Sequence, residues 1–291
     1  MASIRELRTR IKSVNSIRQI TRAMEMVATT KLRRFQDKAV ASRPYSQEIT
    51  GLVGRMARLL GDETGERPLF NPGAGERIAV LLVSSDRGLC GAYNTNIFRA
   101  LEIWLRENPG KQVDYFVVGR KGYQYLSRRG RNVERFLSEP PLEKVDYRAA
   151  ARIAGALIEA FQGGKYERVV GFYTAFESMV KYVPTRMPFL PIESVPADAG
   201  AAGKQGGDLI LVPDAASIFD ALVPRYLETR IFNALLESLT SEFASRRVSM
   251  KNATDAARSM GDALRKVYNR KRQETITKEL LDIVGGAEAL R

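Results

Sequence analysis

The residue types that carry out most enzyme chemistry are scarce in this chain. Its 291 residues include no histidine and a single cysteine, Cys90. Catalysis by Ser-His-Asp or Cys-His arrangements is therefore impossible, and a zinc site would have to be built from carboxylates alone. One cysteine also excludes an internal disulfide and a cysteine-rich metal site. These absences restrict the kinds of catalytic and metal-binding site that the chain can build.

The segment 84–91 (SSDRGLCG) is the one turn that could do chemistry, because it follows an apolar run and precedes a helical pattern. Such a turn can bind an anion at the N-terminus of the following helix. Alternatively, Gly88 and Gly91 serve only to permit the turn. No G-x-x-x-x-G-K-[ST] loop occurs, and no G-x-G-x-x-G follows the apolar run, which disfavours a nucleotide-using enzyme. Cys90 has no base to activate it, so we interpret it as a packing residue.

The middle of the chain alternates between apolar runs and helical patterns. We expect strands at 78–84, 114–118, 168–173, 185–193 and 208–213. Helical patterns lie at 94–107 and 147–161, and the Ala/Gly-rich stretch 196–207 is typical of a loop. Strands that alternate with helices of this length predict a doubly wound, mostly parallel α/β sheet.

The two ends of the chain lack helix breakers over long stretches. Residues 1–43 contain no Gly or Pro, and beyond Arg225 the only breakers are Gly261 and the pair Gly285 and Gly286. A helix of about 55 to 70 residues would be roughly 80 to 105 Å long, too long to bury its apolar stripe on the domain between the two ends. The ends must therefore pack on each other or on a partner, although a helical bundle core is the simpler alternative.

The C-terminal segment has the spacing of a coiled-coil seam. Its members follow an unbroken 3,4 spacing, and one of them, Arg246, is not apolar: Leu236, Leu239, Phe243, Arg246, Met250, Ala253, Ala257, Met260, Leu264 and Val267. Arg246 either extends its long side chain past the seam or fixes the helix register.

The N-terminal segment shows a similar stripe that changes register. The stripe comprises Ile4, Leu7, Ile11 and Val14, then Ile17, Ile20, Met24 and Val27. Ser3 followed by Glu6 is a capping-box signature and predicts that the helix begins there. We expect the helix to end near Pro44 or, if that proline only kinks it, near Gly61.

Positive charge is concentrated on these two ends. Residues 1–43 contain eleven Lys/Arg against three Asp/Glu, and residues 244–272 contain nine against two, in a chain of net charge +13. This distribution favours an acidic protein partner, a nucleic acid or an anionic membrane surface over a merely solvated face. A basic coiled-coil protein that binds nucleic acid is the main alternative class, although the basic segments contain no known nucleic-acid-binding motif.

No apolar run approaches the ~18 residues that span a bilayer, and the N-terminus does not read as a secretory signal.

Several of these segments closely resemble the gamma subunit of bacterial F-type rotary ATP synthases. They are 17–35 (IRQITRAMEMVATTKLRRF), 41–45 (ASRPY), 85–91 (SDRGLCG), 268–280 (YNRKRQETITKEL) and 283–287 (IVGGA). The segments stand in the family's order and spacing. Together they cover both ends of the chain and the first strand-turn of the middle domain.

This resemblance implies a central rotor shaft that couples proton-driven rotation of a membrane c-ring to ATP synthesis at an alpha/beta hexamer. The helices of 1–60 and 213–291 would form an antiparallel coiled coil that flanks an α/β domain over 76–212. The shaft itself would be non-catalytic, with no catalytic, cofactor-binding or metal-binding residues of its own and with ATP or ADP and magnesium bound by partner subunits. Its partners would be the alpha, beta and epsilon subunits and the c-ring, with no nucleic acid and no membrane insertion. It would lie at the cytoplasmic face of the bacterial inner membrane.

The resemblance also implies which residues contact partners. On the first helix they are Met24, Lys31 and Arg33, against the lever of the beta subunit. On the second helix they are Arg246, Arg272, Gln273, Thr277 and Glu279. The turn near the epsilon subunit and the c-ring contributes Asp86, Arg87, Gly88, Cys90 and Gly91.

Overall fold

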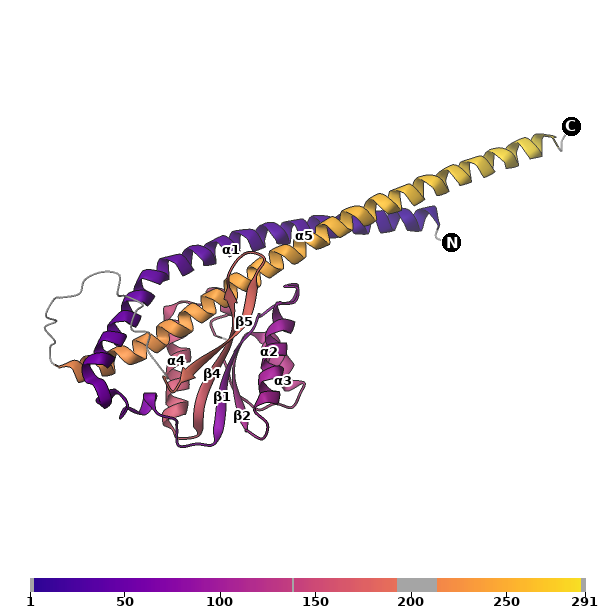
Figure 1. Cartoon of the computed structure of the whole chain (residues 1–291). Coiled ribbons are helices and arrows are strands. Elements are labelled where there is room, and N and C mark those ends of the chain that lie inside the picture. The colour runs from indigo at the N-terminus through magenta and orange to yellow at the C-terminus, as the bar shows by residue number, and fades with distance from the viewer. Residues whose placement is uncertain (1–2, 138, 193–213, 289–291) are drawn as a thin grey trace. The chain divides into compact units, whose positions relative to one another are not determined.

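The computed structural model describes residues 3–137, 139–192 and 214–288, and the chain divides into two compact units. One unit combines helix α1 (Ile4–Leu60) as far as Thr29 with helix α5 (Ala215–Glu288) from Arg246 onward. The other unit is Thr30–Ser245 and contains the sheet. Figure 1 shows both long helices as continuous ribbons.

Helix α1 begins and ends close to the predicted places. The backbone N–H of Glu6 donates to the Ser3 hydroxyl over 3.2 Å, which confirms the predicted N-terminal cap. The Glu6 side chain pairs with Arg10 at 2.6 Å, one helical turn onward. Pro44 lies inside α1, so the later of the two predicted ends, near Gly61, is the correct one.

The unit Thr30–Ser245 is built on a five-stranded sheet with the order β3-β2-β1-β4-β5. The first four of these strands are parallel and β5 is antiparallel to β4, which confirms the doubly wound, mostly parallel prediction. The strands are β1 (Arg77–Val83), β2 (Val113–Val118), β3 (Val133–Phe136), β4 (Tyr166–Phe176) and β5 (Tyr182–Leu190). The strand expected at 208–213 and the loop expected at 196–207 lie outside the described residues.

Three helices cover the two faces of the sheet. They are α2 (Tyr93–Glu107), α3 (Arg120–Ser127) and α4 (Tyr147–Gln162). Helices α2 and α3 lie on one face and α4 lies on the other (Figure 1). Short 3-10 turns occupy the connections at η1 (Gly61–Thr64), η2 (Pro68–Phe70) and η3 (Leu142–Lys144). The α2 face buries a contiguous apolar core that includes Val80, Leu82, Ile97, Leu101, Trp104 and Phe172.

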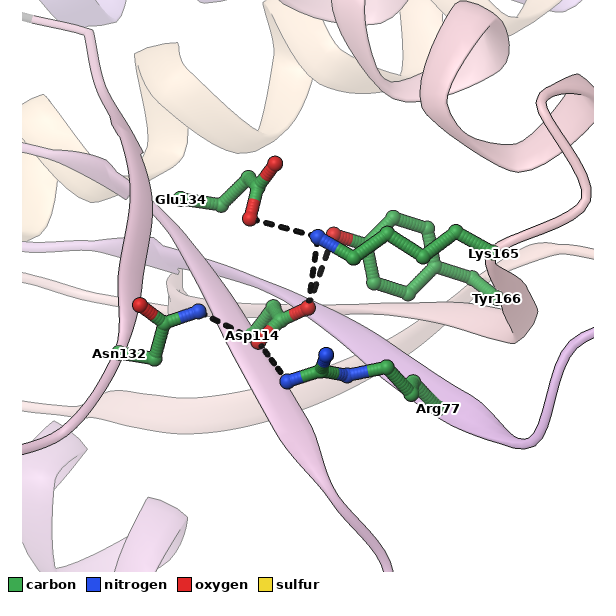
Figure 2. A network of polar contacts seen from close by, with 6 residues as sticks. All are labelled: Arg77, Asp114, Asn132, Glu134, Lys165 and Tyr166. Carbon is green, nitrogen blue, oxygen red and sulfur yellow. Dashed lines mark hydrogen bonds and ion pairs between the residues drawn. The ribbon is translucent and has the colours of Figure 1, made fainter.

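A polar cluster ties together the amino-terminal ends of the parallel strands (Figure 2). Its centre is Asp114 on β2, whose side chain is fully buried. The carboxylate accepts hydrogen bonds from Arg77 and Asn132 at 2.7 Å and from Tyr166 at 3.1 Å, and it pairs with Lys165 at 3.1 Å. Burial alone would raise the pKa of Asp114, but the hydrogen bonds from Asn132 and Lys165 outweigh it, so the pKa lies below its usual value. The ionised carboxylate therefore holds four neighbouring segments of the sheet in register.

Candidate functional site

Within the first unit, the two chain ends pair as antiparallel helices. The hydroxyl of Thr254 donates to the hydroxyl of Thr21 over 2.8 Å. Seven residues further along α5, a Cβ placed on Gly261 would lie 3.7 Å from Val14, which is seven residues earlier on α1. The two helices therefore run in opposite directions, and their contacts repeat with a heptad step.

The buried stripe of α1 keeps one register throughout this unit. Its members have low exposure and an unbroken 3,4 spacing: Ile4, Leu7, Ile11, Val14, Arg18, Thr21, Glu25 and Ala28. The predicted register shift after Val14 is therefore wrong. Ile17, Ile20 and Val27 are more than half exposed, because Arg18, Thr21 and Ala28 occupy the helix contact instead.

The stripe of α5 also departs from the predicted seam. Between Met250 and Tyr268 the residues with low exposure are Ala253, Thr254, Ala257, Gly261, Leu264 and Tyr268, which include the predicted Ala253, Ala257 and Leu264. Met260 and Val267, which were expected in the seam, are 57% and 52% exposed. The middle of this stripe consists of the small residues Thr254, Ala257 and Gly261, which allow the two backbones to come close where Thr21 contacts Thr254 and Val14 contacts Gly261.

Four predicted contact residues lie on α5 beyond the paired region. Continuing the same step places Ile4, the first residue of α1, opposite Lys271. Arg272, Gln273, Thr277 and Glu279 follow that point, and all four are exposed. They share this part of α5 with exposed apolar side chains, namely Ile276, Leu280, Leu281, Ile283 and Val284.

The other predicted contact residues differ in how exposed their side chains are. Arg33 is exposed and Met24 is partly buried. Arg246 is only 7% exposed, so its side chain is enclosed within the protein fold. Lys31 pairs with Glu143 at 2.5 Å and lies 5.3 Å from the ring centre of Phe243, so contacts within this chain already involve its ammonium group.

The turn after β1 is held by its own polar side chains. The Asp86 carboxylate accepts the backbone N–H groups of Arg120 and Leu142, both at 3.1 Å. It thereby joins the start of α3 to the start of η3. The Ser85 hydroxyl donates to the carbonyl of Arg87 over 2.8 Å and closes the turn. Asp86 thus positions the surrounding backbone.

Cys90 lies at the base of this turn and is 2% exposed. Its sulfur accepts the side-chain amide of Asn94 at 3.2 Å, which agrees with its interpretation as a packing residue. The backbone reverses through two positive φ angles, +63° at Leu89 and +55° at Gly91. Glycine adopts this region without strain, whereas leucine rarely does. The Leu89 side chain is 62% exposed, so the turn presents it to the outside.

A row of serines on α5 connects this helix to the carboxyl ends of β1 and β4. The Ser245 hydroxyl donates to the carbonyl of Cys90 over 2.6 Å and accepts from the Tyr182 hydroxyl at 3.0 Å. Ser238 accepts the backbone N–H of Thr174 at 3.1 Å, and Ser241 donates to the Thr174 carbonyl over 3.3 Å. Sequence reasoning missed this row, although its helical spacing beside the apolar seam was a usable signal.

The region under this row is strongly desolvated. Tyr93, at the start of α2, is 1% exposed, and the side chain of Glu242 on α5 lies close enough to act on it. Burial, followed by the charge of Glu242, raises the pKa of the Tyr93 hydroxyl far above its ordinary value. Tyr93 therefore stays neutral, and this region supports packing between α5 and the domain.

Two classes of site are missing from the part of the chain that the structure describes. No group of three or more His, Cys, Asp or Glu side chains within it is arranged to hold a metal ion. No described helix combines the length and apolar character needed to cross a membrane.

Comparison with known proteins supports the resemblance to the gamma subunit over the full length of the chain. The family model described as ATP synthase matches residues 3–290. ATP synthase gamma chains of Rhizobium etli, Paracoccus denitrificans and Trichlorobacter lovleyi are 39%, 37% and 36% identical to this chain, each over 100% of both sequences.

Solved structures of mitochondrial ATP synthases share the fold. A chain of the Euglena gracilis enzyme aligns with a TM-score of 0.64 and 20% identity over 99% of this chain and 94% of its own. A chain from the central stalk and c-ring structure of the Tetrahymena thermophila enzyme aligns with a TM-score of 0.58 and 25% identity over 80% of this chain and 99% of its own. The protein described here belongs to the ATP synthase gamma-chain family.

Proposed function

We propose that this gamma chain works as the central rotor shaft of an F-type ATP synthase. In this role it couples proton-driven rotation of a c-ring to conformational changes and ATP synthesis at an alpha/beta hexamer. The observation that carries the proposal is the antiparallel pairing of the two chain ends through Thr21 and Thr254. Two helices joined along a continuous seam resist twisting better than a single helix does, and a shaft that transmits torque needs this stiffness.

The shaft acts on catalysis without taking part in the chemistry. A rotor contact favours one conformation of a surrounding subunit only if it interacts more strongly with that conformation than with the others. The chain has no histidine, and nothing in its turn after β1 resembles a phosphate loop. We therefore assign ATP, ADP and magnesium to the partner subunits.

The exposed residues of α5 are the best candidates for contacts with the beta subunits. Arg272, Gln273, Thr277 and Glu279 lie beyond the paired region, and all are exposed. The proposal also includes Met24 and Arg33 on α1 as weaker candidates for contacts with the beta subunits. Lys31 already pairs with Glu143, and Arg246 is enclosed within the chain. We therefore propose that both residues stabilise the local fold in addition to any contact with a partner subunit.

The remaining partners are proposed from the turn after β1. Asp86 and Cys90 hold the turn, whereas Arg87, Gly88 and Gly91 are exposed, and we assign their contacts to the epsilon subunit or the c-ring. Such an assembly would place the chain at the cytoplasmic face of a bacterial inner membrane. The alternative of a nucleic-acid-binding coiled coil has no support from the family.

Replacement of both Arg272 and Gln273 by Ala in the reconstituted complex tests the proposed contacts. We expect ATP turnover to fall several-fold, because the double variant loses a cation and an amide that face the beta subunits. Arg270→Ala is the matched control, since it removes the same charge from a side chain that is 85% exposed and pairs with Glu274. Full turnover by the double variant, or an equal loss with the control, would contradict the assignment.

A further inference from the structure

A cavity of about 340 Å³ lies in the unit Thr30–Ser245, between α1, α5 and the end of β4. Its lining residues are Gln36, Ala39, Val40, Ser42, Arg43, Ser46, Gln47, Phe176, Asn233, Leu236, Glu237 and Thr240. Cavities of this size that combine an apolar wall with a few polar groups are typical binding sites for small molecules. The rotor function proposed above makes no use of it.

Most of the hydroxyl and amide groups of the lining satisfy one another. The Ser42 hydroxyl lies 3.3 Å from the side-chain oxygen of Asn233, whose amide donates to Ser46 over 2.8 Å. The Thr240 hydroxyl donates to the carbonyl of Leu236 in its own helix over 2.7 Å. These groups therefore form a closed wall with little capacity for further bonds.

The carboxylate of Glu237 stands apart from that wall. Across the described residues it has no ion pair within 4 Å. Burial raises the pKa of Glu237, while the backbone of Phe176 and the charge of Arg43 act in the opposite direction. A carboxylate that is partly removed from water and lacks a close counter-ion is poorly compensated, so a cation that enters the cavity gains a strong partner.

The remaining surface of the cavity suits the body of an organic cation. Ala39, Val40, Leu236 and Phe176 supply an apolar side, and Val40 keeps 58% of its surface exposed to solvent. The side-chain amides of Gln36 and Gln47 add hydrogen-bonding groups that the described structure leaves unused.

We propose that this cavity binds a small organic cation of the amidinium, guanidinium or amine class, with Glu237 as its counter-ion. The ligand carries a compact apolar group that packs against Val40 and Phe176. Arg43 acts as a weak internal competitor, because it lines the same cavity and its positive charge acts on the Glu237 carboxylate. Removal of Arg43 should therefore strengthen binding, which a merely structural Glu237 would not predict.

Benzamidine is a suitable probe, and benzamide is its neutral counterpart of the same shape. We expect calorimetry on the full-length chain to show binding of benzamidine and at least tenfold weaker binding of benzamide. Glu237→Gln should weaken benzamidine binding at least tenfold, whereas Arg43→Gln should tighten it about two- to fivefold. Glu107→Gln, which removes an exposed acid on α2, is the control and should leave the affinity unchanged.

Val40→Trp provides a second test that keeps the charges intact. The larger side chain should fill the apolar side and abolish binding, and an unchanged melting temperature would show that the fold is intact. Equal binding of benzamide and benzamidine, or benzamidine binding unaffected by Glu237→Gln, would overturn the proposal. A lack of binding by the wild-type chain, with Glu237→Gln weakening only assembly of the complex, would also overturn it, because the carboxylate would then serve a partner subunit.

Discussion

The hydroxyl groups of Thr21 and Thr254 lie 2.8 Å apart although 233 residues separate them in the sequence. This hydrogen bond joins α1 to α5 in the middle of their paired region. The Thr254 hydroxyl oxygen also lies 2.8 Å from the carbonyl oxygen of Met250 within its own helix, so the contact is embedded in the regular helix. Thr21 and Thr254 therefore mark the register of the antiparallel pair, which the apolar pattern alone did not reveal.

Gly261 tests how closely the two helices approach each other. A Cβ at this position would make ordinary van der Waals contact with Val14 at 3.7 Å. Gly261→Ala should therefore raise the free energy of unfolding by about 0.5 to 1 kcal/mol, because alanine has the higher helix propensity. Gly261→Leu should lower it by about 1 to 3 kcal/mol, since the longer side chain overfills the contact. Chemical denaturation of the full chain measures both, and equal effects of Ala and Leu would show that Gly261 does not face α1.

Ser245 tests the connection between α5 and the domain. Its hydroxyl joins the carbonyl of Cys90 to the hydroxyl of Tyr182 in a buried setting. Ser245→Ala should lower the free energy of unfolding by about 1 to 3 kcal/mol, because the buried carbonyl of Cys90 loses this hydrogen bond without regaining water. Ser259→Ala, at an exposed position of the same helix, should change it by less than about 0.5 kcal/mol. A Ser245 variant that denatures like this control would refute the connection.

Asp114 makes the stability of the sheet depend on pH. Its pKa is lower in the folded state than the ordinary value of 3.8, so its stabilising contribution is complete above pH 3.8 and disappears as the pH falls through the folded pKa. Asp114→Asn should lower the free energy of unfolding at neutral pH by about 3 kcal/mol, because Arg77 then loses its buried counter-ion. Below pH 4 the stability of the variant should also fall less steeply than that of the wild-type protein. Thermal unfolding as a function of pH checks this, and parallel pH profiles for the two proteins would contradict it.

The sequence was a good guide to the elements that have strong periodic patterns. The two long helices, the apolar β1 run and the alternation of strands with helices were all readable, because hydrophobic period and breaker placement determine them. Helix α3 and strand β3 were missed, since eight and four residues are too few to establish a period. The antiparallel direction of β5 was also missed, because the expected strands at 168–173 and 185–193 were drawn too short at their facing ends, which hid the short hairpin between Phe176 and Tyr182.

The helix register was the main error, and its cause is physical. A search for apolar residues selects Ile17, Ile20 and Val267, yet the close approach of the helices requires small residues at the contact. Thr21 and Gly261 therefore occupy it, and the larger apolar side chains point outward. The contact residues predicted from the family resemblance fall into two groups according to their exposure. Arg272 and its neighbours are exposed, whereas Asp86 and Cys90 hold the fold together.

Disulfide formation between Thr21→Cys and Thr254→Cys in the assembled ATP synthase tests the central claim most directly. The two hydroxyls already touch, so the paired-shaft account predicts rapid cross-linking within one gamma chain, with ATP hydrolysis retained after oxidation. Native Cys90 is buried and should not interfere. A matched pair that combines Thr21→Cys with Arg258→Cys, on an exposed part of α5, should not cross-link. No disulfide in the first pair, a disulfide between separate gamma chains, or loss of hydrolysis once the two helices are joined would contradict the account.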